Sequence, residues 1–581
     1  MFFEEFASPQ WRMMSQVSRP SRYCASEWRP YPPADWDTAR LKVCLAFPDV
    51  YEIGMSYYGF QIMTALIGRD YLVDRAYCVW PDMEALMRKE NLPLTSAEHQ
   101  KPLHDFDVIA FTLPHEASYT NILTMIDLAG LRLMSSERSD ADPLVIAGGY
   151  GAYEPAVMSA FIDVFCVGEA EALLPQLLPV IAGTKGLPRS ERLSEISRLP
   201  GMYVPMFPHN VERQISRELF PISSMIVPSV GIVHDRAAIE LFRGCSRGCR
   251  FCQAGMVNRP VRERSIDEAK ASILSILEST GWEEAGLLSL ASCDYSGIEA
   301  LIDGLSETLS ARRAKLSLPS LRMDGFSVGL AQRLEGLRSS HGSITFAPEA
   351  GTQRLRDVIN KGINAEMIEG CLREIFSRGW DRVKLYFMMG LPTETYDDLD
   401  AIAELSYSTL KLGRSLGRKR ASVSVSVSGF VPKAHTPFQW ERQNSIEELR
   451  EKGRHIKSLI HDRALSVAYH EPEQTFLEGV LSRGDSRTSR VILRAWETGA
   501  RFDSWTEYFD LKRWLDAFEY CGLEPEEFTR ERREDEVLAW DFVNVGVSRE
   551  FLLRERHRAY EGRLTTDCLS GCAACGLGCV K

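Results

Sequence analysis

The sequence predicts an α/β protein with a doubly wound N-terminal domain, a central partial parallel βα barrel, and a mostly helical C-terminal region that ends in a Cys-rich tail. Three observations support this fold class. Short apolar runs alternate with helical stretches from Leu41 to about Leu178, a second such series follows a Pro-rich stretch, and charged residues and Trp become frequent beyond about residue 445. At 581 residues the chain exceeds the size of one hydrophobic core, so several domains are expected.

The first expected domain covers residues 1–180. Its apolar runs LKVCLAFP, DVIAFTLP, PLVIAGG and FIDVFCVG are short and continuous, which is typical of strands that are buried on both faces of a parallel sheet. The stretches GFQIMTALIG and NILTMIDLAGLRL between them have the length of helices. This alternation predicts a doubly wound sheet.

Residues 181–236 contain six prolines that interrupt any long element, so we expect a connecting segment there. Residues 237–444 then repeat a βα pattern, which predicts a partial or full parallel barrel. The candidate strands are AAIELF, LLSLAS, KLSLPS, SITFAP, VKLYFM and SVSVSV, and helices are predicted near 266–280, 298–313, 327–335, 364–379 and 396–416.

Residues 445–581 are predicted to be helical, with Trp496, Trp505 and Trp514 as packing anchors. The last residues, CLSGCAACGLGCVK, are too short and too small to form a core of their own. We therefore expect an inorganic group or a neighbouring domain to order them.

Composition narrows the function classes. The net charge of −12 argues against a protein that coats nucleic acid, although a local basic groove is compatible with it. The N-terminus carries Glu4 and Glu5 without an apolar stretch, and no run reaches the roughly 18 apolar residues of a membrane helix. We expect a cytoplasmic protein without a membrane partner. Seven of the 14 cysteines form two tight clusters, which favours metal ligation over disulfides.

The central cluster consists of Cys245, Cys249 and Cys252, spaced CxxxCxxC directly after the first barrel strand. Loops at the C-terminal face of a parallel barrel gather catalytic groups. Three thiolates can bind three irons of a cubane cluster and leave the fourth iron open. A structural zinc is the weaker alternative, because no obvious fourth Cys or His lies beside this loop.

With Phe251 before the last Cys, this motif resembles the CxxxCxΦC signature of the radical S-adenosylmethionine (SAM) superfamily. The resemblance implies a [4Fe-4S] cluster on the three cysteines and SAM on its open iron. It also implies that the reduced cluster cleaves SAM to a 5′-deoxyadenosyl radical, which abstracts hydrogen from the substrate. An external one-electron reductant such as flavodoxin or ferredoxin is the implied partner.

The same resemblance suggests further SAM-binding residues. LASCDYSG follows the second strand and offers Ser292 and Asp294, without the usual Gly-Gly-Glu form. FAPEAGTQRLR resembles the Glu-containing segment and offers Glu349, for which a structural salt bridge is the alternative. YFMMGLPTET resembles the Gly-Leu-Pro turn near adenine and offers Gly390, with Glu394 beside it; a plain tight-turn glycine is the alternative.

Arginines are dense around the central cluster. They could bind the carboxylate of SAM, an anionic substrate or RNA, or they could form ion pairs with Glu263, Asp267 and Glu268. The six residues are Arg243, Arg247, Arg250, Arg259, Arg262 and Arg264.

The N-terminal domain resembles the cobalamin-binding domain that precedes many radical SAM barrels. Where that domain has D-x-H-x-x-G, this chain has Asp49, Tyr51 and Gly54, so a tyrosine stands in place of the cobalt-ligating histidine. A neutral phenol is a poor cobalt ligand. Either cobalamin binds without this lower ligand, or the domain has kept the fold and lost the cofactor.

Later landmarks of the cobalamin-binding pattern are better preserved. AGGYGAYEP places Gly148 and Gly149 where a nucleotide tail would pack closely, and FCVGEAEAL places Gly168 and Glu169 in the closing segment. His115, in the middle loop, is a conceivable substitute ligand, although a single histidine is more often structural.

The tail cysteines Cys568, Cys572, Cys575 and Cys579 have the spacing CxxxCxxCxxxxC and could complete a four-thiolate site. A second iron–sulfur cluster and a structural zinc both fit this spacing, and redox-active thiols are a third alternative.

Nearly end to end, the chain resembles an uncharacterised bacterial family of radical SAM proteins with an N-terminal cobalamin-binding-like domain. The resemblance implies functionalisation of a C–H bond, with cobalamin-dependent methylation of a bulky substrate as the leading hypothesis. Sulfur insertion of the methylthiotransferase type and a non-catalytic iron–sulfur or RNA-associated scaffold are the alternatives. The substrate stays open, with RNA or another bulky anionic molecule among the candidates.

Overall fold

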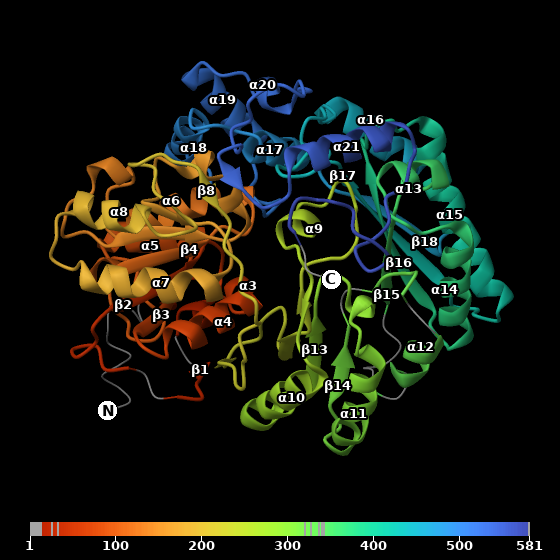
Figure 1. Ribbon diagram of the computed structural model, residues 1–581, viewed down its shortest axis with the longest axis horizontal. Coiled ribbons are helices and arrows are strands. Elements are labelled where there is room, and N and C mark those ends of the chain that lie inside the picture. The colour runs from red at the N-terminus through yellow and green to blue at the C-terminus, as the bar shows by residue number, and fades with distance from the viewer. Residues whose placement is uncertain are drawn as a thin grey trace.

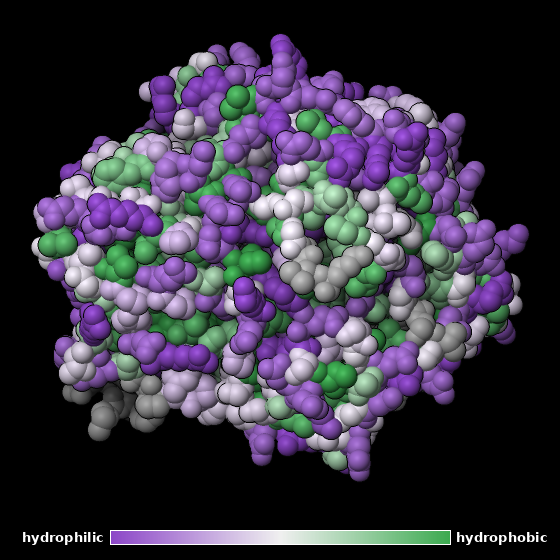
Figure 2. Space-filling model, viewed as in Figure 1, coloured by the Kyte–Doolittle hydropathy of each residue, from purple (hydrophilic) through white to green (hydrophobic). Residues whose placement is uncertain are grey.

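The computed structural model describes residues 14–24, 27–31, 34–318, 321–325, 328–334, 337 and 343–578. Two α/β units face each other, and the C-terminal helices lie across the top of both in Figure 1. Hydrophilic residues cover most of the face shown in Figure 2, where apolar side chains form scattered patches. No helix in the described part of the chain is long and apolar enough to cross a membrane.

The N-terminal unit contains a six-stranded sheet in the order β3-β2-β4-β5-β6-β7. Neighbouring strands are parallel except for β7, which runs antiparallel to β6. The strands are β2 (Lys42–Phe47), β3 (Leu72–Tyr77), β4 (Val108–Thr112), β5 (Leu144–Gly148), β6 (Val164–Cys166) and β7 (Met202–Tyr203). The predicted doubly wound sheet is confirmed.

Both faces of this sheet are covered, as the continuous apolar strands predict. Val43 and Leu45 of β2 pack with α4 (Tyr58–Ile67) and α7 (Ala170–Gly183), whereas Cys44 and Ala46 pack on the opposite face. The helices on that opposite face are α5 (Pro81–Glu90) and α6 (Tyr119–Leu128).

Strand β3 is absent from the sequence-based expectation, because Asp74 and Arg75 interrupt its apolar run. Both side chains are nevertheless buried. Asp74 accepts hydrogen bonds from the backbone N–H groups of Glu98 and His99, and Arg75 pairs with Glu27 at 2.6 Å. Buried charges are tolerated when they are paired in this way.

The connecting segment contains α8 (Arg189–Ser197) and two short strands that join distant parts of the chain. Strand β8 (Val211–Glu212) pairs with β19 (Val543–Asn544) near the C-terminus, and β9 (Val227–Pro228) pairs with β1 (Glu27–Trp28). The segment therefore ties the first and last thirds of the chain together.

The second unit contains seven parallel strands in two sheets within the described residues. This arrangement confirms the predicted partial barrel. The first sheet holds β10 (Ala237–Glu240), β13 (Glu284–Leu288) and β14 (Lys315–Ser317); the second holds β15 (Ile344–Glu349), β16 (Arg382–Met389), β17 (Ser422–Gly429) and β18 (Leu465–Tyr469).

Helices alternate with the barrel strands as expected. They are α10 (Ile266–Thr280), α11 (Ile298–Ala311), α12 (Val328–Leu334), α14 (Ala365–Ser377), α15 (Tyr396–Ser415) and α16 (Ile446–Ser458). The expected helix near 327–335 lies partly outside the described residues. Helix α16 and strand β18 continue the barrel past residue 444, where the sequence predicts its end. The segment LSVAY lies in the region that the sequence predicts to be helical, but it forms an edge strand beside β17.

The C-terminal helices are α17 (Pro472–Ser482), α18 (Thr488–Glu497), α19 (Leu511–Cys521), α20 (Glu526–Thr529) and α21 (Arg549–Tyr560). Val491 and Trp514 belong to the same apolar core as Ile122 and Met125 of α6. These helices therefore complete the core of the N-terminal unit rather than forming a separate one.

Candidate active site

The cysteine loop follows β10 and is closed at its base by a short antiparallel pair, β11 (Phe242–Arg243) and β12 (Arg262–Glu263). Gly244 has φ +93°, and a Cβ there would lie 2.5 Å from the carbonyl oxygen of Pro260. Only glycine fits this close approach of two backbone segments. The loop ends at α9 (Gln253–Val257), where the Sγ of Cys252 accepts the N–H of Gly255 at 3.3 Å.

The three loop thiols interact electrostatically with one another. Burial raises the pKa of the Cys245 thiol, and it raises the pKa of Cys252 to about 12. Metal-free Cys245 and Cys252 are therefore protonated at neutral pH, and ligation of a metal would release their protons.

The donor set fits a cubane cluster. In a cubane each thiolate binds a different iron, and Cys245, Cys249 and Cys252 offer three thiolates on one short loop. The N–H group of Gly255 also supplies the hydrogen bond to sulfur that such clusters use.

Glu349 lies at the C-terminal end of β15 with an unusual backbone. Its φ is +67°, and the pairing register with β16 shifts between Phe346 and Glu349. A left-handed glutamate is strained, and such strain is concentrated at functional sites. Its carboxylate pairs with Lys361 at 3.1 Å, and Lys361 also interacts with Cys249. Glu349 is thus linked to the cysteine loop through Lys361. It also forms the structural salt bridge that the sequence leaves open as an alternative to SAM binding.

Ser292 and Asp294 follow β13 but differ in their surroundings. Ser292 is fully buried, and its hydroxyl donates to the carbonyl oxygen of Leu287. Asp294 pairs with Arg247 of the cysteine loop at 2.6 Å. Asp294 therefore lies beside the loop, whereas the hydroxyl of Ser292 is bound within the protein.

Gly390 follows β16 in a tight turn with φ +86°. Its N–H donates to Oε1 of Glu394 at 2.8 Å, and Glu394 pairs with Lys452 at 2.7 Å. Phe251 packs against the apolar cluster that contains Leu391. The turn therefore lies at the same end of the barrel as the cysteine loop, and its glycine has the structural role that the left-handed φ requires.

All six arginines around the loop bind groups within the chain. Arg243 pairs with Glu171 and Glu240, both at 2.8 Å, and Arg262 pairs with Glu169 at 2.7 Å. Ion pairs therefore form as the alternative predicts, but these partners are Glu240, three residues from Arg243, and the distant Glu169 and Glu171, not Glu263, Asp267 and Glu268. The other four bind as follows: Arg247 to Asp294, Asp324 and Asp567; Arg250 to Glu555; Arg259 to the carbonyl oxygens of Gly255 and Arg247; and Arg264 to those of Glu240 and Phe220.

A contact that the sequence analysis missed joins the loop to the N-terminal unit. Gln253, directly after Cys252, donates a hydrogen bond to the carboxyl group of Glu154. Burial raises the pKa of Glu154 above its ordinary value. Lys433, which follows β17, pairs with Glu116 and Glu478 nearby. These groups come from three regions of the chain, so no local pattern identifies them.

A cavity of about 520 Å³ lies between the two units. Its interior is apolar and is lined by Leu45, Ile62 and Ile146, between the sheet and the α4 and α7 helices. Toward the barrel it is lined by Arg243 and Gly244 of the loop base. The rim carries exposed apolar side chains, which are Tyr57, Tyr150 and Leu290.

Gly148 and Gly149 both line this cavity. Gly149 has φ +97°, and a Cβ there would lie 3.0 Å from the carbonyl oxygen of Leu113. Around Gly148 a Cβ would meet only Cys166, at 3.7 Å. The neighbouring backbone of Leu113 therefore requires glycine at position 149. Gly148, in contrast, leaves space that a ligand can use.

Asp49, Tyr51 and Gly54 do not line this cavity. Asp49 accepts a hydrogen bond from Nε1 of Trp505 at 3.2 Å, and the Tyr51 hydroxyl donates to Glu27 at 2.8 Å. At Gly54 a Cβ would lie 2.5 Å from the ring of Tyr77. The residues of this loop thus contact other parts of the chain. Burial raises the pKa of Tyr51, so its phenol stays neutral.

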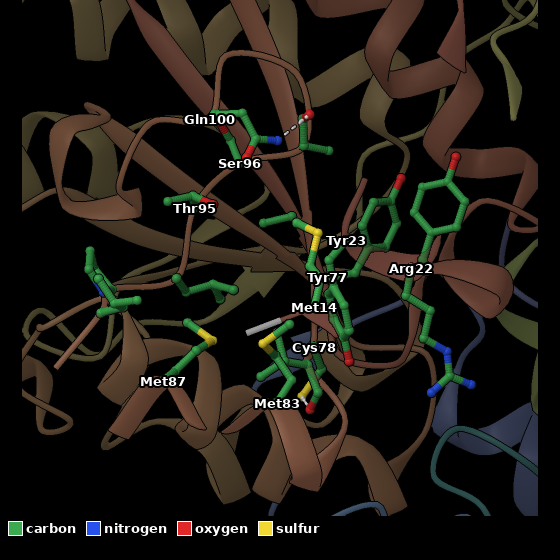
Figure 3. A pocket seen from close by; sticks show the side chains of 17 residues that line it. Met14, Arg22, Tyr23, Tyr77, Cys78, Met83, Met87, Thr95, Ser96 and Gln100 are labelled. Carbon is green, nitrogen blue, oxygen red and sulfur yellow. Dashed lines mark hydrogen bonds between the residues drawn. The ribbon is translucent and has the colours of Figure 1, made fainter. Parts of the chain in front are cut away.

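Tyr51 lines a second, smaller cavity of about 190 Å³ beside β3 and α5. Figure 3 shows the sulfur-containing side chains of Met14, Met83, Met87 and Cys78 around it. His115 has an exposed side chain and lines neither of the two cavities.

The described tail cysteines differ in exposure, and Cys568 lies next to the cysteine loop. Cys568 and Cys572 are exposed and Cys575 is buried, while Cys579 lies outside the described residues. The backbone N–H of Cys568 donates to the carbonyl oxygen of Ser246 at 2.9 Å.

Comparisons with known proteins agree with this architecture. A family model for the N-terminal part of radical SAM proteins matches residues 59–205, and the model of the radical SAM superfamily matches residues 239–406. A relative from Methanocaldococcus jannaschii, described as uncharacterized protein MJ0966, is 27% identical over 461 residues, which are 78% of this chain and 90% of the relative.

Two solved structures are similar to this chain, and the first of them shares its fold. TsrM from Kitasatospora setae, a radical SAM methyltransferase with cobalamin and a [4Fe-4S] cluster bound, has a TM-score of 0.52 at 12% identity and covers 84% of this chain and 100% of its own. The cobalamin-dependent radical SAM enzyme OxsB, with aqua-cobalamin and SAM bound, has a TM-score of 0.49 at 14% identity, over 90% of this chain and 79% of its own. The superfamily model covers the strand that precedes the cysteine loop and most of the barrel behind it. Residues 239–406 therefore form a radical SAM domain, and the chain is an enzyme that uses a [4Fe-4S] cluster and SAM.

Proposed function

We propose that this enzyme functionalises a C–H bond of a bulky substrate by cobalamin-dependent methylation. The observation that carries the proposal is the cavity of about 520 Å³ between the N-terminal sheet and the base of the cysteine loop. Its size is that of a cofactor or ligand pocket, and it lies at the carboxyl ends of parallel strands, where such sheets bind ligands. The likeness to TsrM supports this fold for the two units together.

In this proposal Cys245, Cys249 and Cys252 hold the catalytic cluster. Glu349 and Lys361 present a carboxylate and an ammonium group beside Cys249, and these suit the amino and carboxylate groups of SAM. When bound, the cluster and SAM supply one-electron and hydrogen-abstraction chemistry. The chain orients these groups by fixing the loop at both ends, through Arg243 to the N-terminal unit and through Arg250 to α21.

Cobalamin would be held by the residues that line the larger cavity. The apolar interior between β2, β5, α4 and α7 suits an aromatic base, and Gly148 leaves space for close approach. Tyr51 is bound to Glu27 and is absent from this lining, so it would supply no ligand to cobalt. The sequence leaves two alternatives, which are cobalamin bound without a lower protein ligand and a domain that has lost the cofactor. We favour the first.

Anaerobic reconstitution with iron, sulfide and hydroxocobalamin tests the proposal. We expect the wild type to retain cobalamin, seen by its visible absorption, and to release 5′-deoxyadenosine from SAM under reducing conditions. Gly148→Leu places a side chain in the cavity from a position where a Cβ meets only van der Waals contact, so it should keep its iron and lose cobalamin. Wild-type protein that cleaves SAM but retains no cobalamin would eliminate the methylation chemistry.

The same preparation distinguishes the alternatives. A Cys245→Ala, Cys249→Ala, Cys252→Ala variant should lose SAM cleavage, and a wild type that cleaves no SAM would favour the scaffold alternative. Sulfur insertion of the methylthiotransferase type would add sulfur together with a methyl group to the substrate, whereas methylation would add a methyl group without sulfur. An anionic substrate such as RNA gains no support from the six arginines around the loop, because all of them are bound within the chain.

A further inference from the structure

The smaller cavity, of about 190 Å³, lies beside β3, the edge strand of the N-terminal sheet. It shares no described lining residue with the larger cavity. Residues 76–79, at the carboxyl end of β3, contribute to its lining, as do Met83 and Met87 of α5. The carboxyl ends of parallel strands are where such sheets bind ligands. The cavity therefore lies where a second, separate ligand site can form.

The N-terminal segment closes the cavity on a further side. Met14, Arg22 and Tyr23 belong to the lining. The N–H and the hydroxyl of Ser18 both donate to Asp82 in the first turn of α5, at 2.8 Å. A ligand in the cavity would thus be held between β3, α5 and this segment.

The lining carries little charge. Among the described lining residues only Arg22 is charged. Its guanidinium pairs with Glu52 at 2.9 Å and lies 4.9 Å from the ring centre of Trp80. These residues therefore offer no unpaired charge to a ligand, and the site suits a neutral molecule.

Backbone N–H groups of the lining are bonded within the chain. Those of Leu94, Ser96 and Ala97 donate to carbonyl oxygens at 2.7–2.9 Å. A ligand that needs several hydrogen-bond donors from the protein, such as a nucleobase, would leave its acceptors unpaired here. The site therefore suits a mostly apolar molecule.

Three tyrosines line the cavity, and the hydroxyl of one lacks a partner. Tyr51 donates to Glu27 at 2.8 Å, and Tyr23 accepts the N–H of Trp80 at 3.2 Å. Tyr77 is only 8% exposed, and its hydroxyl has no hydrogen-bond partner within the described ranges. Burial raises the pKa of this phenol, so it stays a neutral donor. A buried hydroxyl without a partner is costly, and an acceptor atom of a ligand would satisfy it.

The other lining groups suit a flat aromatic ring. The rings of Tyr51 and Tyr77 pack edge to face, with their centres 5.0 Å apart. The thioethers of Met14, Met83 and Met87 surround the cavity in Figure 3, and such sulfur atoms make favourable contacts with aromatic rings. Apolar cavities of about 150 Å³ bind benzene. A cavity of about 190 Å³ therefore has room for one ring or two small fused rings.

We propose that the smaller cavity is a binding site for a neutral, flat aromatic molecule of one or two fused rings, whose acceptor atom takes the hydrogen bond of the Tyr77 hydroxyl. The site is separate from the cysteine loop and from the larger cavity, so it goes beyond the proposed function.

Equilibrium dialysis of the reconstituted full chain tests the site with two probes of similar shape. Quinoline has an acceptor nitrogen, whereas naphthalene has none. Both are used at micromolar concentration and pH 8, where quinoline is neutral. SAM and hydroxocobalamin are present in excess, because quinoline could otherwise bind to iron or in the larger cavity.

The Tyr77→Phe variant tests the hydrogen bond. It should bind quinoline about two- to tenfold more weakly than the wild type, as expected for the loss of one hydrogen bond, and bind naphthalene equally well. The matched control Tyr520→Phe removes the hydroxyl of an exposed side chain and should leave both affinities unchanged. An equal effect of Tyr77→Phe on the two probes would overturn the proposed hydrogen bond.

The Met87→Trp variant tests the cavity itself, because it places a larger side chain in the lining. It should lose the binding of both probes, whereas Met206→Trp, at an exposed position outside the cavity, should retain it. A wild type that binds neither probe, or binds both no better than Met87→Trp does, would overturn the site. Tyr77→Phe changes the shape of the side chain very little, so the comparison of the two probes stands even where Met87→Trp folds poorly.

Discussion

Glu349 combines a strained backbone with a position between Lys361 and the cysteine loop. Replacing it by Gln keeps the shape of the side chain and removes the charge. Because a hydrogen bond to a charged group contributes about 1.5–3 kcal/mol, we expect Glu349→Gln to bind SAM at least about tenfold more weakly. Equilibrium dialysis of the reconstituted variant measures this change, with the iron content unchanged.

Glu366→Gln is the matched control for this substitution. Glu366 lies in the first turn of α14 with an exposed side chain. It should bind SAM like the wild type. Equal SAM affinity of both variants would show that Glu349 serves only its salt bridge.

His435 connects the barrel to the N-terminal unit, since its Nε2 lies 3.0 Å from the carbonyl oxygen of Tyr153. Burial lowers the pKa of His435 from 6.5 to about 4. Between these values the unfolded chain takes up a proton that the folded chain does not bind. The free energy of unfolding therefore falls as the pH drops from about 6.5 to about 4, by on the order of 3 kcal/mol in total.

His435→Asn should remove this dependence, and Asn tolerates the left-handed backbone at this position, where φ is +60°. Urea unfolding at pH 7, 6 and 5 should show a shallower decline for the variant than for the wild type. The exposed His461→Asn variant should follow the wild type. If the free energy of unfolding fell equally with pH in all three proteins, the pH dependence would not come from His435.

At the scale of elements, the turn after Glu349 depends on close packing against α15. A Cβ at Gly351 would lie 2.6 Å from the backbone oxygen of Asp398 and from the backbone nitrogen of Ile402. Because neither backbone atom can move freely, Gly351→Ala should destabilise the protein by about 1–3 kcal/mol. Chemical denaturation measures this loss.

Gly370 in α14 provides the opposite case. No heavy atom lies within 4 Å of a Cβ built there, and the residue is exposed within the helix. Gly370→Ala should therefore stabilise the protein by about 0.5–1 kcal/mol through helix propensity. If Gly351→Ala and Gly370→Ala changed the stability in the same direction, the close packing of the turn against α15 would not explain the effect of Gly351→Ala.

Element prediction failed where packing outweighed local composition. The run LVDRAY contains two charged residues in its middle and still forms the buried strand β3, because Glu27 and His99 supply partners from other segments. Conversely, Trp496 and Trp505 act as the predicted anchors. Their indole nitrogens donate to Thr124 and Asp49 of the N-terminal unit.

At the scale of the whole molecule, the C-terminal helices cover one face of the N-terminal sheet. Val491, Ile492, Trp514 and Phe518 are buried in the core that they share with α6. Burial of each such side chain contributes about 1.5–3 kcal/mol, and their sum approaches the net stability of a typical domain.

A chain that ends at Tyr469 should therefore lack a cooperative unfolding transition and bind hydrophobic dyes. A chain that ends at Glu561 keeps these helices and should unfold cooperatively. Thermal unfolding followed by near-ultraviolet circular dichroism compares the two. Cooperative unfolding of the shorter chain would show that the N-terminal unit is independent of the C-terminal helices.

The sequence by itself determined the fold class, six of the seven barrel strands in the described residues and the cysteine loop. These features depend on local periodicity and on the spacing of a few residues. Such patterns lie within one segment and do not depend on how that segment packs against others. The family resemblance likewise rests on local motifs, such as Phe251 between Cys249 and Cys252.

Only the tertiary structure decided how the site is assembled. In the structure Tyr51 does not line the larger cavity, and all six arginines around the cysteine loop bind groups within the chain. The backbone of Cys568 in the tail is hydrogen-bonded to Ser246 of that loop. Arg247 and Asp567 are 320 residues apart in the chain, and Arg250 and Glu555 are 305 apart. Such pairs depend on how whole units pack, and no local pattern in the sequence contains that information.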